Sequence, residues 1–298
     1  MSAMTDDAAG FDPAAGLVPT EAKIARREML RQLMHSKTFI VGTVVVLFWV
    51  FWAITGSSFT PHDPLEQTSE ILKSPSSSAW FGTDQFGRDI FSRVLAGAQS
   101  TLRVAPAATL VAITLGTILG LIMGFVGGFT DDAISRLVDA ILALPLIVIA
   151  VVVLTALGSS NFTLILVIGL IFTSPISRTV RATVLGERQL DYVQAAQLRG
   201  ERGPYIMFVE ILPNIMGPII VETTVRLGYS IFAIAGLTFL GFGVQPPSPD
   251  WSLQISENYT LLSAGTYWWT VVFACLAITT LVIAVNLVAD GLQQVVDE

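Results

Sequence analysis

Residues 140–177, AILALPLIVIAVVVLTALGSSNFTLILVIGLIFTSPIS, form the stretch that decides the fold, because none of its 38 residues carries a charge. A helix that crosses the hydrocarbon of a bilayer needs about 20 mostly apolar residues, so this stretch is too long for one ordinary crossing. Residues 158–161 (GSSN) lie near its middle and are a turn signal. We therefore expect two membrane crossings here, one on each side of the turn.

Four further apolar stretches are long enough to cross a bilayer. They lie at residues 39–54, at 104–130, within 212–243 and within 258–289. With the two crossings above, they predict an all-α, polytopic membrane protein with six transmembrane helices. An even number of crossings places both termini on the same side.

The composition agrees with a membrane protein and excludes several functions. Charged residues make up 13% of the 298 residues, about half the fraction of a soluble domain. A net charge of −7 and the lack of a basic block with interleaved aromatics argue against a nucleic-acid partner. One cysteine, Cys275, and two histidines argue against a disulfide framework or a metal site, so we expect no metal.

Basic residues predict which side is cytoplasmic, since short cytoplasmic segments carry the Lys and Arg excess. Five precede the first crossing and five lie between the fourth and fifth, whereas residues 244–266 have none. We therefore expect both termini in the cytoplasm, although Lys73, Arg88 and Arg93 on the outer side run against the rule. The basic residues that set the orientation are Lys23, Arg26, Arg27, Arg31 and Lys37, then Arg178, Arg181, Arg188, Arg199 and Arg202.

The chain divides into three regions. Residues 1–22 are expected to be a disordered cytoplasmic tail, because they are rich in Ala, Asp, Gly and Pro. Residues 23–100 contain the first crossing and an extracytoplasmic loop; this crossing is too long for a signal peptide and lacks a cleavage site. Residues 101–298 form the core, with a cytoplasmic loop at about 178–210.

Motifs of catalysis are missing. A phosphate-binding P-loop needs a Gly-Lys step, and none of the three lysines follows a glycine. Neither a G-x-S-x-G elbow nor an H-E-x-x-H motif occurs, and Gly243 is followed by Val244 where an intramembrane aspartyl protease has an aspartate. We expect no catalytic residue and no ATPase site in this chain.

Gly116, Gly120 and Gly124 recur at every fourth position in the second crossing. Glycines spaced in this way leave a groove on one helix face that admits another backbone. The groove can pack within this chain or against a partner subunit, and we favour the first because six crossings must pack internally.

The polar segment between the fourth and fifth crossings is helix-permissive. Tyr192, Ala195, Ala196 and Arg199 recur at i, i+3, i+4 and i+7, which places them on one helix face. Gly200 follows, where a helix can end in a left-handed conformation. A solvated surface helix is one interpretation, and a docking surface is the other.

This segment resembles a known family. Residues 191–200 (DYVQAAQLRG), followed ten residues later by 211–214 (ILPN), are similar to the EAA loop of ABC-importer permeases, which docks into the ATPase subunit. Gln194 stands where the motif expects Glu, and Glu210 replaces its usual basic residue or histidine. The resemblance assigns ATPase coupling to Tyr192, Gln194, Ala195, Ala196, Arg199, Gly200, Glu210 and Pro213.

Further stretches resemble the C-type permeases of dipeptide, oligopeptide and nickel importers. They are residues 81–93 (FGTDQFGRDIFSR), 136–139 (RLVD) with Pro145, 240–251 (LGFGVQPPSPDW) and 286–292 (NLVADGL). The resemblance implies a type I ABC importer permease fold in a prokaryotic inner membrane, surrounded by lipid. It also implies a homologous B-type permease, two cytoplasmic ATPases that use ATP and Mg, and an extracytoplasmic substrate-binding protein. This chain would bind no cofactor, and peptides are the favoured cargo.

Glu222 and Arg226 in the fifth crossing are spaced i, i+4 and can pair on one helix face. They either line the translocation path or form a neutral pair that packs the bundle. Such intramembrane charges also suit an ion-coupled secondary transporter or channel, which is the alternative class. A secondary carrier, however, has no need of an EAA-type loop.

Overall fold

The computed structural model describes residues 31–296, so the expected disordered tail at residues 1–22 lies outside the described residues. Helices are the only regular elements in this part of the chain, apart from a β-bridge between Thr83 and Asp89. In chain order they are α2 (Lys37–Thr55), η1 (Gly56–Phe59), α3 (Ile90–Val126), α4 (Gly128–Leu142), α5 (Leu146–Leu157), α6 (Asn161–Glu187), α7 (Asp191–Leu198), α8 (Gly203–Tyr205), η2 (Ile206–Ile211), α9 (Leu212–Asn214), α10 (Met216–Phe239), α11 (Trp251–Asn258), η3 (Tyr259–Ala264) and α12 (Trp269–Val296).

Six membrane crossings are present when one bent helix pair is counted as a span. The helices α2, α3, α6, α10 and α12 are each long and apolar enough to cross, and α4 and α5 meet at an angle of 89°. Pro145 explains the bend, because proline lacks an N–H and disfavours helical geometry at the preceding Leu144. The third crossing thus begins at Gly128 and includes charged residues, whereas the sequence predicted that it starts after Asp139.

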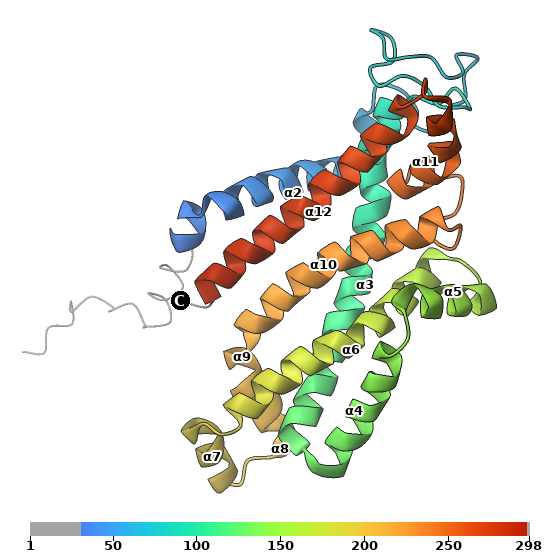
Figure 1. Ribbon diagram of the computed structural model, residues 1–298. Coiled ribbons are helices and arrows are strands. Elements are labelled where there is room, and N and C mark those ends of the chain that lie inside the picture. The colour runs from blue at the N-terminus through green and yellow to red at the C-terminus, as the bar shows by residue number, and fades with distance from the viewer. Residues whose placement is uncertain (1–30, 297–298) are drawn as a thin grey trace, which may run out of the picture.

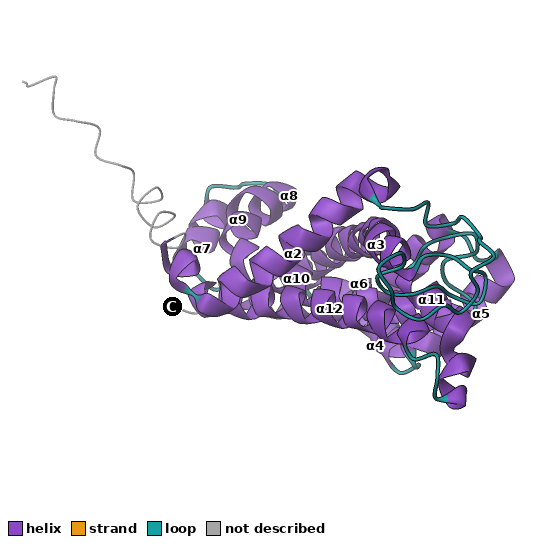
Figure 2. Ribbon diagram, turned by 90° about the horizontal axis from the view of Figure 1, so that it is seen from above, coloured by secondary structure: helices purple, strands orange, loops and turns teal. Residues whose placement is uncertain are grey.

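The bundle has two distinct ends (Figure 1). The segment between η1 and α3 gathers with α11 and η3 at one end, which we call the loop end. The start of α2, the end of α12 and the helix α7 lie at the other, which we call the α7 end, and Figure 2 shows the same separation from above. Both chain ends of the spanning bundle therefore lie on the side of α7, as an even number of crossings requires.

The most extensive packing between two helices is that of α3 against α6. A Cβ atom added at Gly116, Gly120 or Gly124 would lie 2.5 to 2.7 Å from side-chain atoms of α6. The residues that these three glycines face are Ile176, Val180 and Val184. The glycine groove therefore packs within the chain, because only glycine permits so close an approach.

Two aspartates of α4 form ion pairs with α6. Asp131 Oδ1 lies 2.5 Å from Arg181 Nε, and the carboxylate of Asp139 contacts the guanidinium of Arg178. Both arginines belong to α6, which continues as one helix to Glu187. The first ten residues of the predicted loop 178–210 are therefore part of α6, and the two arginines among them have partners on the neighbouring helix α4.

Candidate functional site

The helix α7 is short, and its two ends are defined by local chemistry. Asp191 in the first turn is favourable there, since the helix N-terminus carries a partial positive charge. At the other end, the N–H of Gly200 donates to the carbonyl of Gln197 (3.0 Å), and that of Glu201 donates to Ala196 (3.2 Å). This is a Schellman motif, and Gly200 has the left-handed φ of +78° that it requires.

The inner face of α7 corrects one part of the sequence prediction. Val193 and Ala196 are fully buried in the core, while Ala195 is exposed and Leu198 is 89% exposed. Ala196 therefore cannot form a surface for another protein, although it was predicted to share a docking face with Ala195. The helix is amphipathic: Val193 and Ala196, spaced i, i+3, form its buried face. Ala195 and Ala196 therefore lie on opposite sides of the boundary between the exposed and buried faces.

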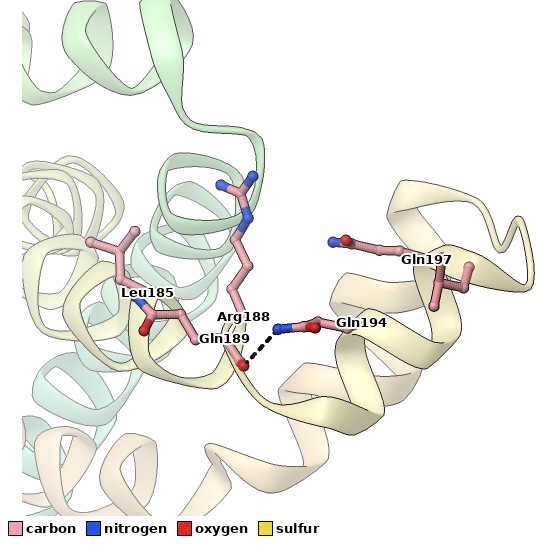
Figure 3. A pocket seen from close by; sticks show the side chains of 6 residues that line it. Leu185, Arg188, Gln189, Gln194 and Gln197 are labelled. Atoms are coloured by element: carbon pink, nitrogen blue, oxygen red, sulfur yellow. Dashed lines mark hydrogen bonds between the residues drawn. The ribbon is translucent and has the colours of Figure 1, made fainter.

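A groove of about 630 Å³ lies between the end of α6 and the exposed side of α7 (Figure 3). The side-chain amide of Gln194 donates to the backbone carbonyl of Gln189 (3.0 Å) at its base. Arg188 rises from the end of α6, and its guanidinium lies 6.0 Å from the ring centre of Phe125. Within residues 31–296, Arg188 has no acidic partner. The groove thus offers an unpaired cation and amide groups to a binding partner.

Tyr192 joins α7 to the end of α6. Its hydroxyl donates to the carboxylate of Glu187. Burial, together with this neighbouring carboxylate, raises the pKa of Tyr192 to about 12, so the phenol stays neutral. The contact holds α7 against the end of α6.

The chain returns toward the membrane through η2, which is π-helical, and α9. Arg199 Nη2 lies 3.3 Å from Glu210 Oε1, so the acidic residue at position 210 pairs with the end of α7. Pro213 occupies the first turn of α9, where a missing N–H costs little. The side-chain amide of Asn214 donates to the carbonyl of Glu210 (2.8 Å) next to the break in the helix.

The predicted pair in the fifth crossing is formed. Arg226 Nε lies 2.6 Å from Glu222 Oε1, and both side chains are partly buried. The guanidinium also lies 5.4 Å from the ring centre of Tyr229. Neither charge is isolated, so the pair is compatible with both interpretations made from the sequence.

An ionic cluster at the loop end was not predicted as a site. The side chain of Arg93 is 0% exposed; its Nη2 lies 3.4 Å from Glu257 Oε2 and its Nε 3.8 Å from Asp84 Oδ2. Arg88 Nε lies 2.7 Å from Asp84 Oδ2, and Arg88 also contacts the Glu257 carboxylate. The i, i+4 spacing of Asp84 and Arg88 could have indicated one of these pairs, but nothing in the sequence indicates the distant Glu257.

Comparison with known proteins decides the family. A family model described as "Binding-protein-dependent transport system inner membrane component" matches residues 116–298, more than half of the chain. The chain belongs to this permease family. A second model, "N-terminal TM domain of oligopeptide transport permease C", matches residues 26–75.

Curated relatives resemble the permease over most of its length. The "Dipeptide transport system permease protein DppC" of Alkalihalophilus pseudofirmus is 37% identical, over 91% of this chain and 89% of the relative. The Escherichia coli protein of the same name is 36% identical, over 91% and 92%. The "Glutathione transport system permease protein GsiD" of Pectobacterium atrosepticum is 32% identical, over 91% and 90%.

The permease is therefore a multi-pass membrane subunit of a bacterial ABC transport system, with the type I permease fold. Subunits of this family are not themselves enzymes, and they work with a partner permease, ATPases and a substrate-binding protein. The ion-coupled carrier or channel weighed from the sequence finds no support.

Proposed function

We propose that this chain is the C-type permease of an ATP-driven peptide importer. In this proposal it forms a translocation path with a homologous B-type permease, and two cytoplasmic ATP-binding subunits drive the path between inward and outward access. Relatives named for dipeptide, di/tripeptide and glutathione transport support a peptide cargo.

The exposed side of α7 carries this proposal. Leu198 stands out from a short helix at the α7 end, and beside it lies a groove with the unpaired cation Arg188. A large exposed apolar side chain next to such a groove is typical of a protein-binding surface. An ATPase helix or loop with an acidic group fits the groove, and pressure on α7 would pass through Val193 and Ala196 into the helix core.

This division of labour leaves ATP and Mg to the partner subunits. None of the three lysines follows a glycine, so the chain has no P-loop of its own. The Lys and Arg distribution supports a cytoplasmic α7 end, with both termini on that side. The loop end then faces the extracytoplasmic binding protein.

The Glu222–Arg226 pair belongs to the path in this proposal. Ionisable groups inside a membrane span commonly mark transport routes, and each partner lowers the cost of burying the other. Glu222→Gln and Arg226→Gln should each lower peptide uptake while assembly with the other subunits continues. Normal uptake in both variants would leave the pair a packing role only.

The test is an enlargement of the docking surface. Ala195→Trp should leave the permease inserted but separate it from the ATPase subunits during purification and abolish ATP-driven dipeptide uptake. Ala156→Trp is the matched control, because Ala156 is also exposed but lies on α5. Full ATPase association and uptake with Ala195→Trp would contradict the proposal, as would peptide uptake that an ion gradient drives without any ATPase subunit.

A further inference from the structure

A polar pocket of about 390 Å³ opens at the loop end, away from the α7 groove. Three elements build it: the first half of α3, the turn between α5 and α6, and the segment between α10 and α11. Its volume lies in the range of small-ligand sites. The lining includes Gln99, Arg103, Asn161, Gln245 and Ser248.

Arg103 is the one charged side chain that lines this pocket. It makes no ion pair or side-chain hydrogen bond within residues 31–296, in contrast to Arg88 and Arg93 nearby on the same end. The adjacent carboxylate of Asp250 is buried, and its Oδ1 accepts the backbone N–H groups of Ser252 and Leu253. Arg103 is exposed, so the pocket contains a solvent-accessible positive charge that has no acidic partner in the described part of the chain, and no carboxylate lines it.

The other polar groups complement an anion. The N-terminus of the 27-residue helix α6 lines the pocket at Ser160 and Asn161. Ser160 Oγ accepts the N–H of Thr163, whereas the preceding N–H groups of the first turn have no partner within the helix. A helix N-terminus and a guanidinium together favour a carboxylate, which the guanidinium can bind with two parallel hydrogen bonds.

We infer that this pocket receives the free C-terminal carboxylate of a peptide as it enters the permease, with Arg103 as its ionic partner. The inference rests on the proposed peptide cargo and adds the end of the peptide that is recognised. The N-terminal ammonium finds no acidic partner in the lining, so the carboxylate end is the one bound.

The first test uses the complete transporter in liposomes with its binding protein. Dialanine uptake should fall about tenfold in Arg103→Gln, because one charge-assisted hydrogen-bonded pair contributes about that factor. Assembly and binding-protein-stimulated ATP hydrolysis should continue. Arg103→Lys should give an intermediate rate, since it keeps the charge and loses the two-pronged geometry. Lys73→Gln removes a positive charge at the same end but outside the pocket, and should transport normally.

The second test needs no transport. Asn161→Cys in a Cys275→Ala background of the assembled transporter places a thiol in the pocket. An anionic thiosulfonate reagent should label this thiol several-fold faster than a cationic one when Arg103 is present, and Arg103→Gln should abolish that difference in rate. Dialanine should slow the labelling, and dialanine amide should not.

Several results would overturn the inference. Parental dialanine uptake in Arg103→Gln would do so, as would a reagent preference that does not depend on Arg103. Loss of subunit assembly in Arg103→Gln would instead assign Arg103 to an interface with another subunit. If the parental transporter assembles and hydrolyses ATP but takes up no peptide, the cargo proposal fails, and labelling that dialanine does not slow then overturns the pocket's role as well.

Discussion

At the loop end, Arg93 is fully buried beside the carboxylates of Asp84 and Glu257, whereas at the α7 end Leu198 is 89% exposed and Arg188 has no acidic partner within residues 31–296. The buried charges of this loop-end cluster thus have partners of opposite sign within the chain. The α7 end leaves a cation, amide groups and an apolar side chain for another molecule. The difference agrees with the proposal that a partner subunit completes the α7 end, whereas the ionic cluster of the loop end is completed within the chain.

The largest effect on stability is expected in the buried ionic cluster of the loop end. Arg93→Met should lower the free energy of unfolding by about 3 to 5 kcal/mol, because it leaves the carboxylates of Asp84 and Glu257 with Arg88 as their one remaining cation in a largely buried cluster. Denaturant unfolding in detergent measures the change. Lys73→Met is the control, since Lys73 forms an exposed pair with Glu70 and such pairs contribute about 0 to 1 kcal/mol. Equal losses in both variants would mean that the loop-end cluster is not a special source of stability.

The next largest effect on stability is expected where α3 packs against α6, the contact that joins the two ends of the bundle. Gly120→Ala should cost about 1 to 3 kcal/mol in unfolding free energy, because its Cβ would lie 2.5 Å from Val180. Gly236→Ala should be neutral or slightly stabilising, since no atom lies within 4 Å of an added Cβ there. Adding Val180→Ala to Gly120→Ala should recover part of the loss. A lack of any difference between the two glycine variants would refute the close α3–α6 packing.

At the α7 end, Gly200→Ala should have a smaller and local effect. A non-glycine residue at a left-handed φ costs about 1 to 2 kcal/mol, and here it would loosen only the last turn of α7. We expect weaker ATPase binding in a pull-down with little change in global unfolding. Gly186→Ala, in the last turn of α6 with open space around it, should bind the ATPase normally. A large loss of global stability in Gly200→Ala would show that α7 is part of the stable core.

The smallest expected effect concerns Tyr192. Tyr192→Phe removes one hydrogen bond to Glu187 and should cost about 0.5 to 1.5 kcal/mol. The folded pKa of Tyr192 is raised from 10.0 to about 12, so the stability that its neutral phenol contributes is complete below pH 10 and is lost as the pH rises toward 12. The free energy of unfolding, measured from pH 9 to 12, should therefore decline less steeply in Tyr192→Phe than in the parent. An unchanged pH profile would contradict the shifted pKa.

The sequence predicted the number of crossings but not the shape of the third one. Charge-free length locates apolar helices well, because the bilayer sets their length. It missed the charged helix α4, since the ion pairs of Asp131 and Asp139 with α6 depend on tertiary contacts. Pro145 was noted only as part of a family motif, so the 89° bend between α4 and α5 was not predicted.

The sequence predicted where α7 ends and which charges pair in the fifth crossing, but it did not predict which face of α7 is buried. Gly200 at the end of α7 and the pairing of Glu222 with Arg226 follow from local rules and are seen in the structure. The side of α7 that faces inward does not follow from the small size of Ala195 and Ala196, because both alanines fit a core or a surface equally well. The exposure of Arg188 and Leu198 depends on how the end of α6 packs beside α7, so the sequence alone does not predict it.

Cross-linking at Leu198 tests most directly whether the α7 end is completed by an ATPase. Leu198→Cys in a Cys275→Ala background would be joined to neighbouring lysines by a thiol- and amine-reactive reagent in the transport-competent complex. Leu110→Cys, on the exposed side of α3, is the control. We predict an ATPase adduct at position 198 whose yield changes when ATP is added, and none at position 110. A complex that transports peptide but gives no ATPase adduct at position 198 would contradict the account.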